Sequence, residues 1–223
     1  MKNMKKISKA ILLSAVFFGF LADNIEAKFI STIDKSSKIT MEEYPYAEFV
    51  KNFSEEIISV QEEHLTHEQA QQRFVDITNQ YIAVENISRF LMGTIYRKKN
   101  PEERTKIRKC VLNLLATRLV SELPHGKSTK IEITDVKKIG TGKLARWNVY
   151  VKYTIDNKKY EVIFHVYDTK SGRKIFDAVK DNVSMKKIQR ADIDGKMRNV
   201  GENKFLKDFY KKYDVKYYPK NPV

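Results

Sequence analysis

The chain has 223 residues, a formal net charge of +14 at pH 7 and 42% hydrophobic residues. This length suits one domain with its own core and is too short for two comfortable domains. A single cysteine, Cys110, excludes an internal disulfide, so the fold must rely on its hydrophobic core.

The N-terminal segment has the pattern of an export signal. Lysines at positions 2, 5, 6 and 9 precede an apolar run of thirteen residues from Ala10 to Ala22, whereas a membrane span needs about 20. The pattern predicts a secretory signal peptide over residues 1–27, with cleavage after Ala27, and an uncleaved anchor is the alternative. An exported protein without disulfides indicates the bacterial periplasm.

The positive charge is concentrated in the second half of the chain. Residues 28–124 carry 14 basic and 14 acidic side chains, whereas residues 125–223 carry 24 and 12, a net charge of +12. A basic half favours an anionic partner, which could be nucleic acid, a phospholipid surface or an acidic protein. The export signal argues against nucleic acid. A lysine-rich solvated surface without any partner would give the same composition.

The first mature half has apolar residues at helical spacing. Thr66 and Gln69 form a capping-box pair, and Asn100-Pro101 supplies an N-cap followed by a proline at the first helical position. The last of these helices places Cys110 on an apolar stripe, so we expect a buried thiol. Helices are expected over residues 46–60, from 66 to beyond 77, over 81–96, and from 101 to before 124.

After His125 the apolar period changes from about 3.6 to 2, which indicates strands. Turn signals at Asp156-Asn157 and Ser171-Gly172 make the strands sequential antiparallel neighbours. Two more helices and a polar tail over residues 217–223 close the chain. The strands are expected over residues 131–136, 147–155, 160–166 and 174–181, and the helices over 184–197 and 201–213.

The predicted fold is a single α+β domain over residues 28–216. It has a helical N-terminal half, a four-stranded curled antiparallel sheet, and C-terminal helices packing over one sheet face. Large side chains alternate on that face, among them Trp147, Tyr153, Phe164 and Phe176. Such a face forms either an ordinary packed core or the lining of an apolar pocket.

No arrangement of residues indicates an enzyme. Four histidines are scattered along the chain, and none has a third ligand at a useful spacing, so no metal site is expected. There is no P-loop and no nucleophile elbow. Asp177, on a strand beside an apolar cavity, could act as a general base. A strand residue that faces solvent explains Asp177 equally well, because no second polar group is obviously paired with it.

Two separated motifs resemble one protein family. The run from Ile175 to Met185, with Arg190, is similar to the "vyDv…eGvSl…yR" signature of periplasmic phospholipid-binding proteins of the MlaC type, the toluene-tolerance auxiliary component family. Upstream, residues 87–104 are similar to that family's "iAr..lG..y…tpeeR" segment. The order of helices and strands agrees over roughly residues 40–213. The chain departs from the pattern at Arg173 (often tryptophan), Asn182 (often glycine) and Gln189 (often aromatic).

The resemblance implies a carrier that covers phospholipid acyl chains in a cavity between sheet and helices. It would shuttle lipid between an outer-membrane lipoprotein complex and an inner-membrane ABC transporter with MCE-domain subunits. The expected carrier is a monomer in the periplasm, makes transient contacts with membrane proteins, has no cofactor and carries phospholipid as cargo. The alternatives are a small-molecule enzyme with Asp177 as base and a periplasmic adaptor that binds an acidic protein.

The predicted site has two parts. Lys186, Lys187 and Arg190 are expected near the exit, where they would contact head groups or acidic partners. For Lys186 and Lys187 the alternative is a solvated face. Ser184 is expected to cap the following helix. The lipid-contacting residues are expected to be Phe90, Leu91, Tyr96, Trp147, Val149, Val151, Tyr153, Phe164, Val166, Phe176, Val179, Val183 and Met185.

Overall fold

The computed structural model describes residues 30–33, 39–63, 65–122, 129–142, 145–155 and 157–214. The predicted signal peptide and polar tail lie outside these residues and stay predictions. Within the described ranges, no helix combines the length and the hydrophobicity that a membrane crossing requires.

Between residues 44 and 122 the described chain is mostly helical, as predicted. Thr66 and Gln69 exchange the two hydrogen bonds of a capping box, and this opens the second helix. Gly93 adopts a φ of +52°, which breaks the segment expected as one helix over 81–96 into two. These helices are α1 (Tyr44–Glu62), α2 (His67–Tyr81), α3 (Val84–Met92), α4 (Thr94–Lys98) and α5 (Pro101–Glu122).

Among the described residues, the sheet has six strands in the order β1-β2-β3-β4-β5-β6. The predicted antiparallel meander forms its centre, and two short strands that the sequence analysis did not predict pair with its edges. β1 runs parallel to β2, and β6 pairs with β5 through a tight turn in which Asp181 and Asn182 both have positive φ. The strands are β1 (Ile30–Ile33), β2 (Thr129–Ile139), β3 (Arg146–Ile155), β4 (Lys158–Thr169), β5 (Gly172–Lys180) and β6 (Val183–Ser184).

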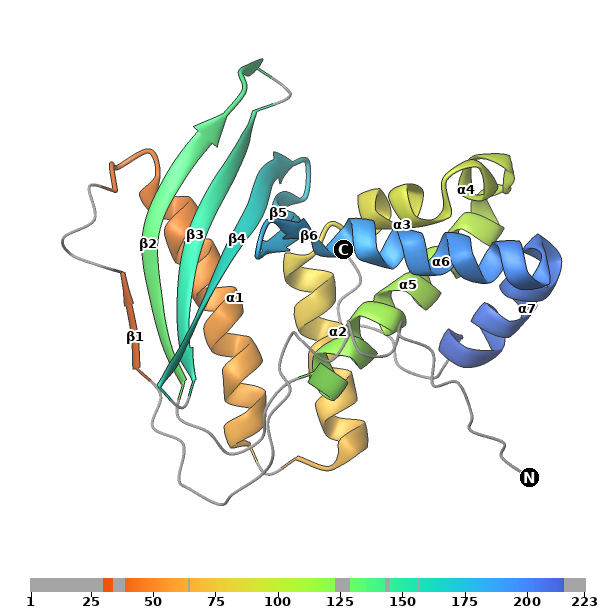
Figure 1. Cartoon of the computed structure of the whole chain (residues 1–223), viewed down its shortest axis with the longest axis horizontal. Coiled ribbons are helices and arrows are strands. Elements are labelled where there is room, and N and C mark those ends of the chain that lie inside the picture. Colours follow the sequence, from red (N-terminus) through yellow and green to blue (C-terminus); the bar gives the residue numbers. More distant parts are fainter. Residues whose placement is uncertain are drawn as a thin grey trace, which may run out of the picture.

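Two hydrophobic cores hold the domain together. The first lies between α1, α2 and the inward face of the sheet, where the alternating residues from Trp147 to Ile155 are buried as predicted. The second joins α3, α4 and α5 to the C-terminal helices α6 (Met185–Val200) and α7 (Glu202–Tyr213). In Figure 1 the curved sheet lies on one side of the molecule with α1 and α2 beside it, and α3, α4, α6 and α7 lie on the other side. The α+β architecture is therefore confirmed.

Arg190 and Gly93, one from each of the two motifs, meet beside the second core. The Arg190 guanidinium donates to the carbonyl oxygens of Phe90 (2.8 Å) and Leu91 (2.9 Å), at the C-terminal end of α3. It also donates to Asp194 at 2.7 Å. A Cβ atom at Gly93 would lie 2.5 Å from a guanidinium nitrogen. Glycine is thus needed here both for its backbone conformation and for the space that Arg190 fills.

We expect Gly93→Ala to lower the free energy of unfolding by about 1–3 kcal/mol, because alanine strains the positive φ and displaces Arg190. Urea unfolding followed by circular dichroism measures this change. Gly195→Ala is the matched control, since Gly195 lies inside α6 with open space around its Cβ position. That variant should gain about 0.5–1 kcal/mol. Equal effects at the two glycines would contradict the packing role of Gly93.

Candidate functional site

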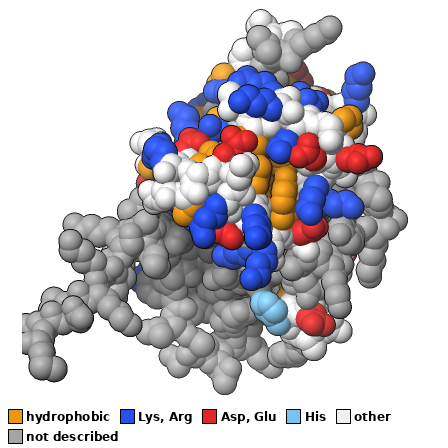
Figure 2. Space-filling view, turned by 90° about the vertical axis from the view of Figure 1, so that its right-hand side faces the viewer, with side chains coloured by type: hydrophobic (Ala, Val, Ile, Leu, Met, Phe, Trp, Pro, Cys, Tyr) orange, Lys and Arg blue, Asp and Glu red, His pale blue; other side chains and the backbone are white. Residues whose placement is uncertain are grey.

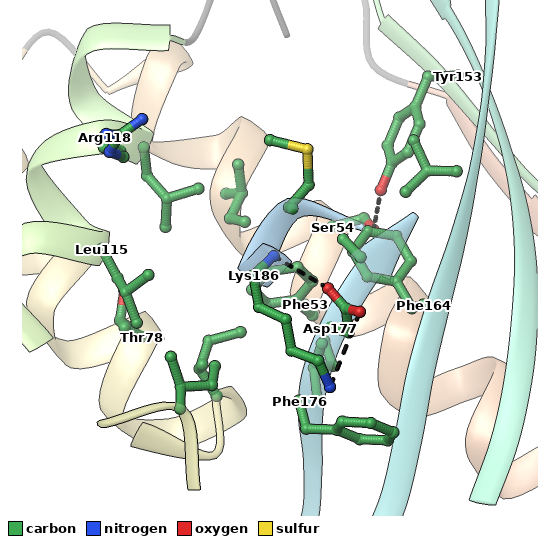
Figure 3. A pocket seen from close by; sticks show the side chains of 18 of the residues that line it. Phe53, Ser54, Thr78, Leu115, Arg118, Tyr153, Phe164, Phe176, Asp177 and Lys186 are labelled. Atoms are coloured by element: carbon green, nitrogen blue, oxygen red, sulfur yellow. Dashed lines mark hydrogen bonds and ion pairs between the residues drawn. The ribbon is translucent and has the colours of Figure 1, made fainter. Parts of the chain in front are cut away.

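An apolar pocket lies where the two cores meet. Its walls come from α1, the ends of α2 and α5, the start of α3, the inner face of β2–β5, and the first two turns of α6 (Figure 3). Its volume is about 200 Å³. The lining is mostly hydrophobic and includes Phe53, Ile57, Ile58, Leu119, Phe164 and Ile175. A folded protein normally fills such a space with side chains, so an open apolar pocket is suited to an apolar guest.

The structure brings four of the predicted lipid-contacting residues to this pocket: Tyr153, Phe164, Phe176 and Met185. Lys186 lines it as well. That these side chains contact lipid stays a prediction.

Nine predicted residues lie outside the pocket. Leu91 and Tyr96 are buried in the second core, and Phe90 is 38% exposed beside it. Only the end of β3 reaches the pocket, because its earlier residues pack under the first half of α1; Trp147, for example, stacks on Tyr46 at 4.3 Å. Val149, Val151 and Val166 likewise belong to the first core, and Val179 and the 46% exposed Val183 lie on β5 and β6 away from the lining.

A β-bulge explains why Val179 does not face the pocket. Val166 pairs with Ile175, but the preceding His165 pairs with Asp177, so Phe176 is an extra residue in β5. The side-chain alternation shifts by one at this point. Ala178, which pairs with Phe164, therefore lines the pocket. Without the bulge, alternation from Ile175 would place Val179 there.

The part of the pocket wall formed by α1, α2 and α5 was not predicted as part of the site. Leu115 and Leu119 lie on α5, whose apolar stripe predicted only a buried helix face, and no pattern in the sequence marked Thr78 or Gln189 as pocket residues. Their placement depends on how α2, α5 and α6 pack, which a periodic pattern does not encode. The apolar residues of α5 spread over more than one face of the helix, which indicates contacts on several sides but not a pocket.

Ser54 and Tyr153 join the two sides of the pocket through a hydrogen bond. The two hydroxyl oxygens lie 2.7 Å apart. Within α1, the Ser54 hydroxyl also donates a hydrogen bond to the Val50 carbonyl oxygen at 2.8 Å. Burial raises the pKa of Tyr153, so its hydroxyl stays protonated. The pair satisfies two polar groups inside an otherwise apolar wall.

Asp177 fixes the junction between β5 and α6. Its carboxylate accepts hydrogen bonds from the Ser184 hydroxyl (2.7 Å) and the Lys186 backbone N–H (3.2 Å). The Lys186 ammonium lies 3.8 Å away, and His165 Nδ1 lies 3.9 Å away. Ser184 accepts in turn from the Lys187 N–H, which confirms the predicted helix cap. Both carboxylate oxygens thus have structural partners, and no observation favours Asp177 as a general base.

Burial and the charge of Asp177 act in opposite directions on the pKa values of the two basic groups beside it. Desolvation lowers the pKa of His165 and of Lys186, and the nearby Asp177 carboxylate opposes both changes. The Lys186 ammonium lies 4.4 Å from the centre of the Phe176 ring and 5.3 Å from that of Phe90. Lys186 therefore packs along the wall of the pocket, whereas Lys187 is exposed to solvent.

Arg190 makes contacts within the protein that the sequence did not predict. Its guanidinium binds the end of α3 and Asp194, so its hydrogen bonds serve packing inside the protein. We therefore do not include it among the head-group residues of the proposed site. Cys110 is buried in the second core, as expected, and burial raises the pKa of its thiol to about 12. The described residues contain no cluster of metal-ligating side chains.

We expect Asp177→Ala to lower the free energy of unfolding by about 1–3 kcal/mol, because the Ser184 hydroxyl and the Lys186 N–H lose their acceptor. Asp192→Ala is the control, since Asp192 is a partly exposed partner of Lys196, and its removal should cost less than about 1 kcal/mol. Urea unfolding measures both variants. An Asp177→Ala variant as stable as the control would show that this carboxylate does not hold the junction.

Comparison with known proteins agrees with the resemblance seen in the sequence. No curated protein matches the chain. Among solved structures, the fold is similar to a phospholipid-binding protein from Ralstonia solanacearum determined in complex with a phospholipid, with a TM-score of 0.56 and 11% sequence identity. The match covers 75% of this chain and 96% of that protein. The family model described as MlaC protein matches residues 51–211, and the chain therefore belongs to the MlaC family.

Proposed function

We propose that the protein is a periplasmic phospholipid carrier that holds acyl chains in the apolar pocket. The observation that carries this proposal is the pocket itself, open and apolar at the junction of the two cores. Membership of the MlaC family and the phospholipid in the similar Ralstonia protein support it. Each methylene group that leaves water gains about 0.8 kcal/mol, so an apolar wall provides affinity without precise hydrogen bonding.

The volume of the pocket limits how a lipid is held. A cavity of about 150 Å³ is enough for benzene, so about 200 Å³ receives several methylene groups of one chain. A whole two-tailed phospholipid needs more room, because pockets for ligands of even drug size reach 300–1,000 Å³. Loading must then widen the pocket. The junction between two cores can open in this way while each core keeps its own packing.

The proposed route runs between an outer-membrane lipoprotein complex and an inner-membrane ABC transporter with MCE-domain subunits. The predicted signal peptide supports a periplasmic location. Figure 2 shows Lys and Arg side chains gathered over the end of the molecule formed by α4 and α7, with fewer acidic groups among them. Exposed cations on these helices are Arg97, Lys98, Lys204, Lys207, Lys211 and Lys212. Such a surface favours encounters with acidic partners.

We expect Leu115→Glu to abolish retention of phospholipid. Leu115 lines the pocket from α5 and is only partly buried, so the fold should tolerate the change. A bound acyl chain would have to desolvate the new carboxylate, which is costly. Mass spectrometry of an organic extract of the purified protein measures the retained lipid. Val200→Glu, at a position 42% exposed on α6, should keep its lipid. Equal loading of both variants, or a wild-type protein free of lipid, would contradict the proposal.

We expect neutralising three exposed lysines of α7 to slow association with the transporter. In this variant Lys204, Lys207 and Lys211 become glutamine, and the association rate with a purified MCE-domain subunit should fall about tenfold at low salt. The control changes three exposed lysines of the sheet side to glutamine, namely Lys130, Lys159 and Lys170. Stopped-flow fluorescence measures the rates. Because the change in net charge is the same, equal rates for the two variants would refute docking through α7.

A further inference from the structure

Two polar atoms of side chains that line the pocket have no hydrogen-bond partner among the residues that the structure describes. Thr78 is completely buried in α2, and within the described part of the chain its hydroxyl oxygen has no partner. The same holds for Oε1 of Gln189, which is 7% exposed in α6. Both side chains line the pocket. Neither oxygen is accessible from the pocket in this structure, so a guest reaches it only as the pocket widens. Folded proteins leave few buried polar atoms unsatisfied, so an unsatisfied atom on a side chain that lines a cavity indicates a chemical group of its guest.

The other hydroxyls on this wall show that the fold can satisfy such groups. Ser54 and Tyr153 bond to each other, and Ser54 also reaches the Val50 carbonyl of its own helix. A helical threonine usually finds a carbonyl oxygen one turn earlier in the same way, but Thr78 does not make this bond. Its hydroxyl lies on the helical side of the pocket, across from Tyr153 and Phe164 on the strands (Figure 3).

A hydrocarbon chain offers no acceptor to the Thr78 hydroxyl, whereas the carbonyl oxygen at the head of an acyl chain does. Gln189 Oε1 is an acceptor and suits a hydroxyl or ammonium group of the polar end of the same molecule. This inference rests on the proposed function. We propose that the acyl ester of the lipid enters the pocket and accepts a hydrogen bond from Thr78. The site therefore selects ester-linked lipids over ether-linked lipids.

Competition between two matched lipids tests this inference. The full chain, stripped of lipid, is incubated with equal amounts of diester and diether phosphatidylethanolamine of the same chain length, and the bound ratio is measured by mass spectrometry. Wild-type protein should enrich the diester about two- to tenfold, the range that one net hydrogen bond gives. Thr78→Val keeps the shape of the side chain and should bind both lipids equally. Thr78→Ser keeps the hydroxyl and should retain the preference.

A volume control separates hydrogen bonding from packing. Ile57→Val removes one methyl group from the pocket wall and should change binding of both lipids alike. Thr78→Val should also melt no lower than the wild type, because it removes a buried hydroxyl that has no partner in the lipid-free protein. A fall in melting temperature would mean that the hydroxyl has a structural role, against the proposal.

The remaining outcomes are distinguishable. Uptake of neither lipid would refute the carrier function itself. Equal uptake of both by the wild type would leave the carrier function standing and refute the ester contact, as would a preference that survives in Thr78→Val. Palmitic acid is a third competitor. If it displaces the diester at equal concentration, and this advantage is lost in Thr78→Val, the acceptor is a free carboxyl group and the proposed ester is wrong.

Discussion

Helix α5 packs against both hydrophobic cores, and the pocket depends on this arrangement. Leu112 and Ala116 belong to the core under the sheet, whereas Ile107, Val111 and Leu114 belong to the core with α6 and α7. On a helix of 3.6 residues per turn, these two sets form separate stripes. Leu115 and Leu119 lie between the stripes and line the pocket. Because α5 packs against both cores, its side chains between the two stripes are not fully covered by either core, and the pocket lies there.

The other side of the hollow is set by the end of β5. The bulge at Phe176 turns Ala178 toward the pocket and directs Asp177 to the start of α6. Because the carboxylate binds both the Ser184 hydroxyl and the Lys186 N–H, the first turn of α6 is held against the sheet. Farther along α6, Arg190 binds the end of α3. One helix is thus fastened at two points, and its first turn completes the pocket wall.

The polar groups of the pocket divide into two kinds. Asp177, Ser54 and Tyr153 are satisfied within the protein and stabilise the wall. Thr78 and Gln189 each present an oxygen that has no partner among the described residues. This division separates the groups that maintain the site from the groups that can recognise a guest. The surface cations of α4 and α7 lie outside the pocket. In the proposed function they contact partner proteins and not the cargo.

The amino-acid sequence by itself determined the class of the fold. Strong local signals gave the capping box at Thr66, the strict alternation from Trp147 to Ile155 and the buried Cys110, because such signals act within one helix or strand. Alternation could not say that Trp147 fills a core while Tyr153 lines a pocket, since both lie on the same face of β3. Nor could it reveal the bulge that places Ala178 on the pocket wall, where simple alternation expects Val179. Only the tertiary structure decided these points, because a hollow is defined by residues from several elements and by how closely those elements approach.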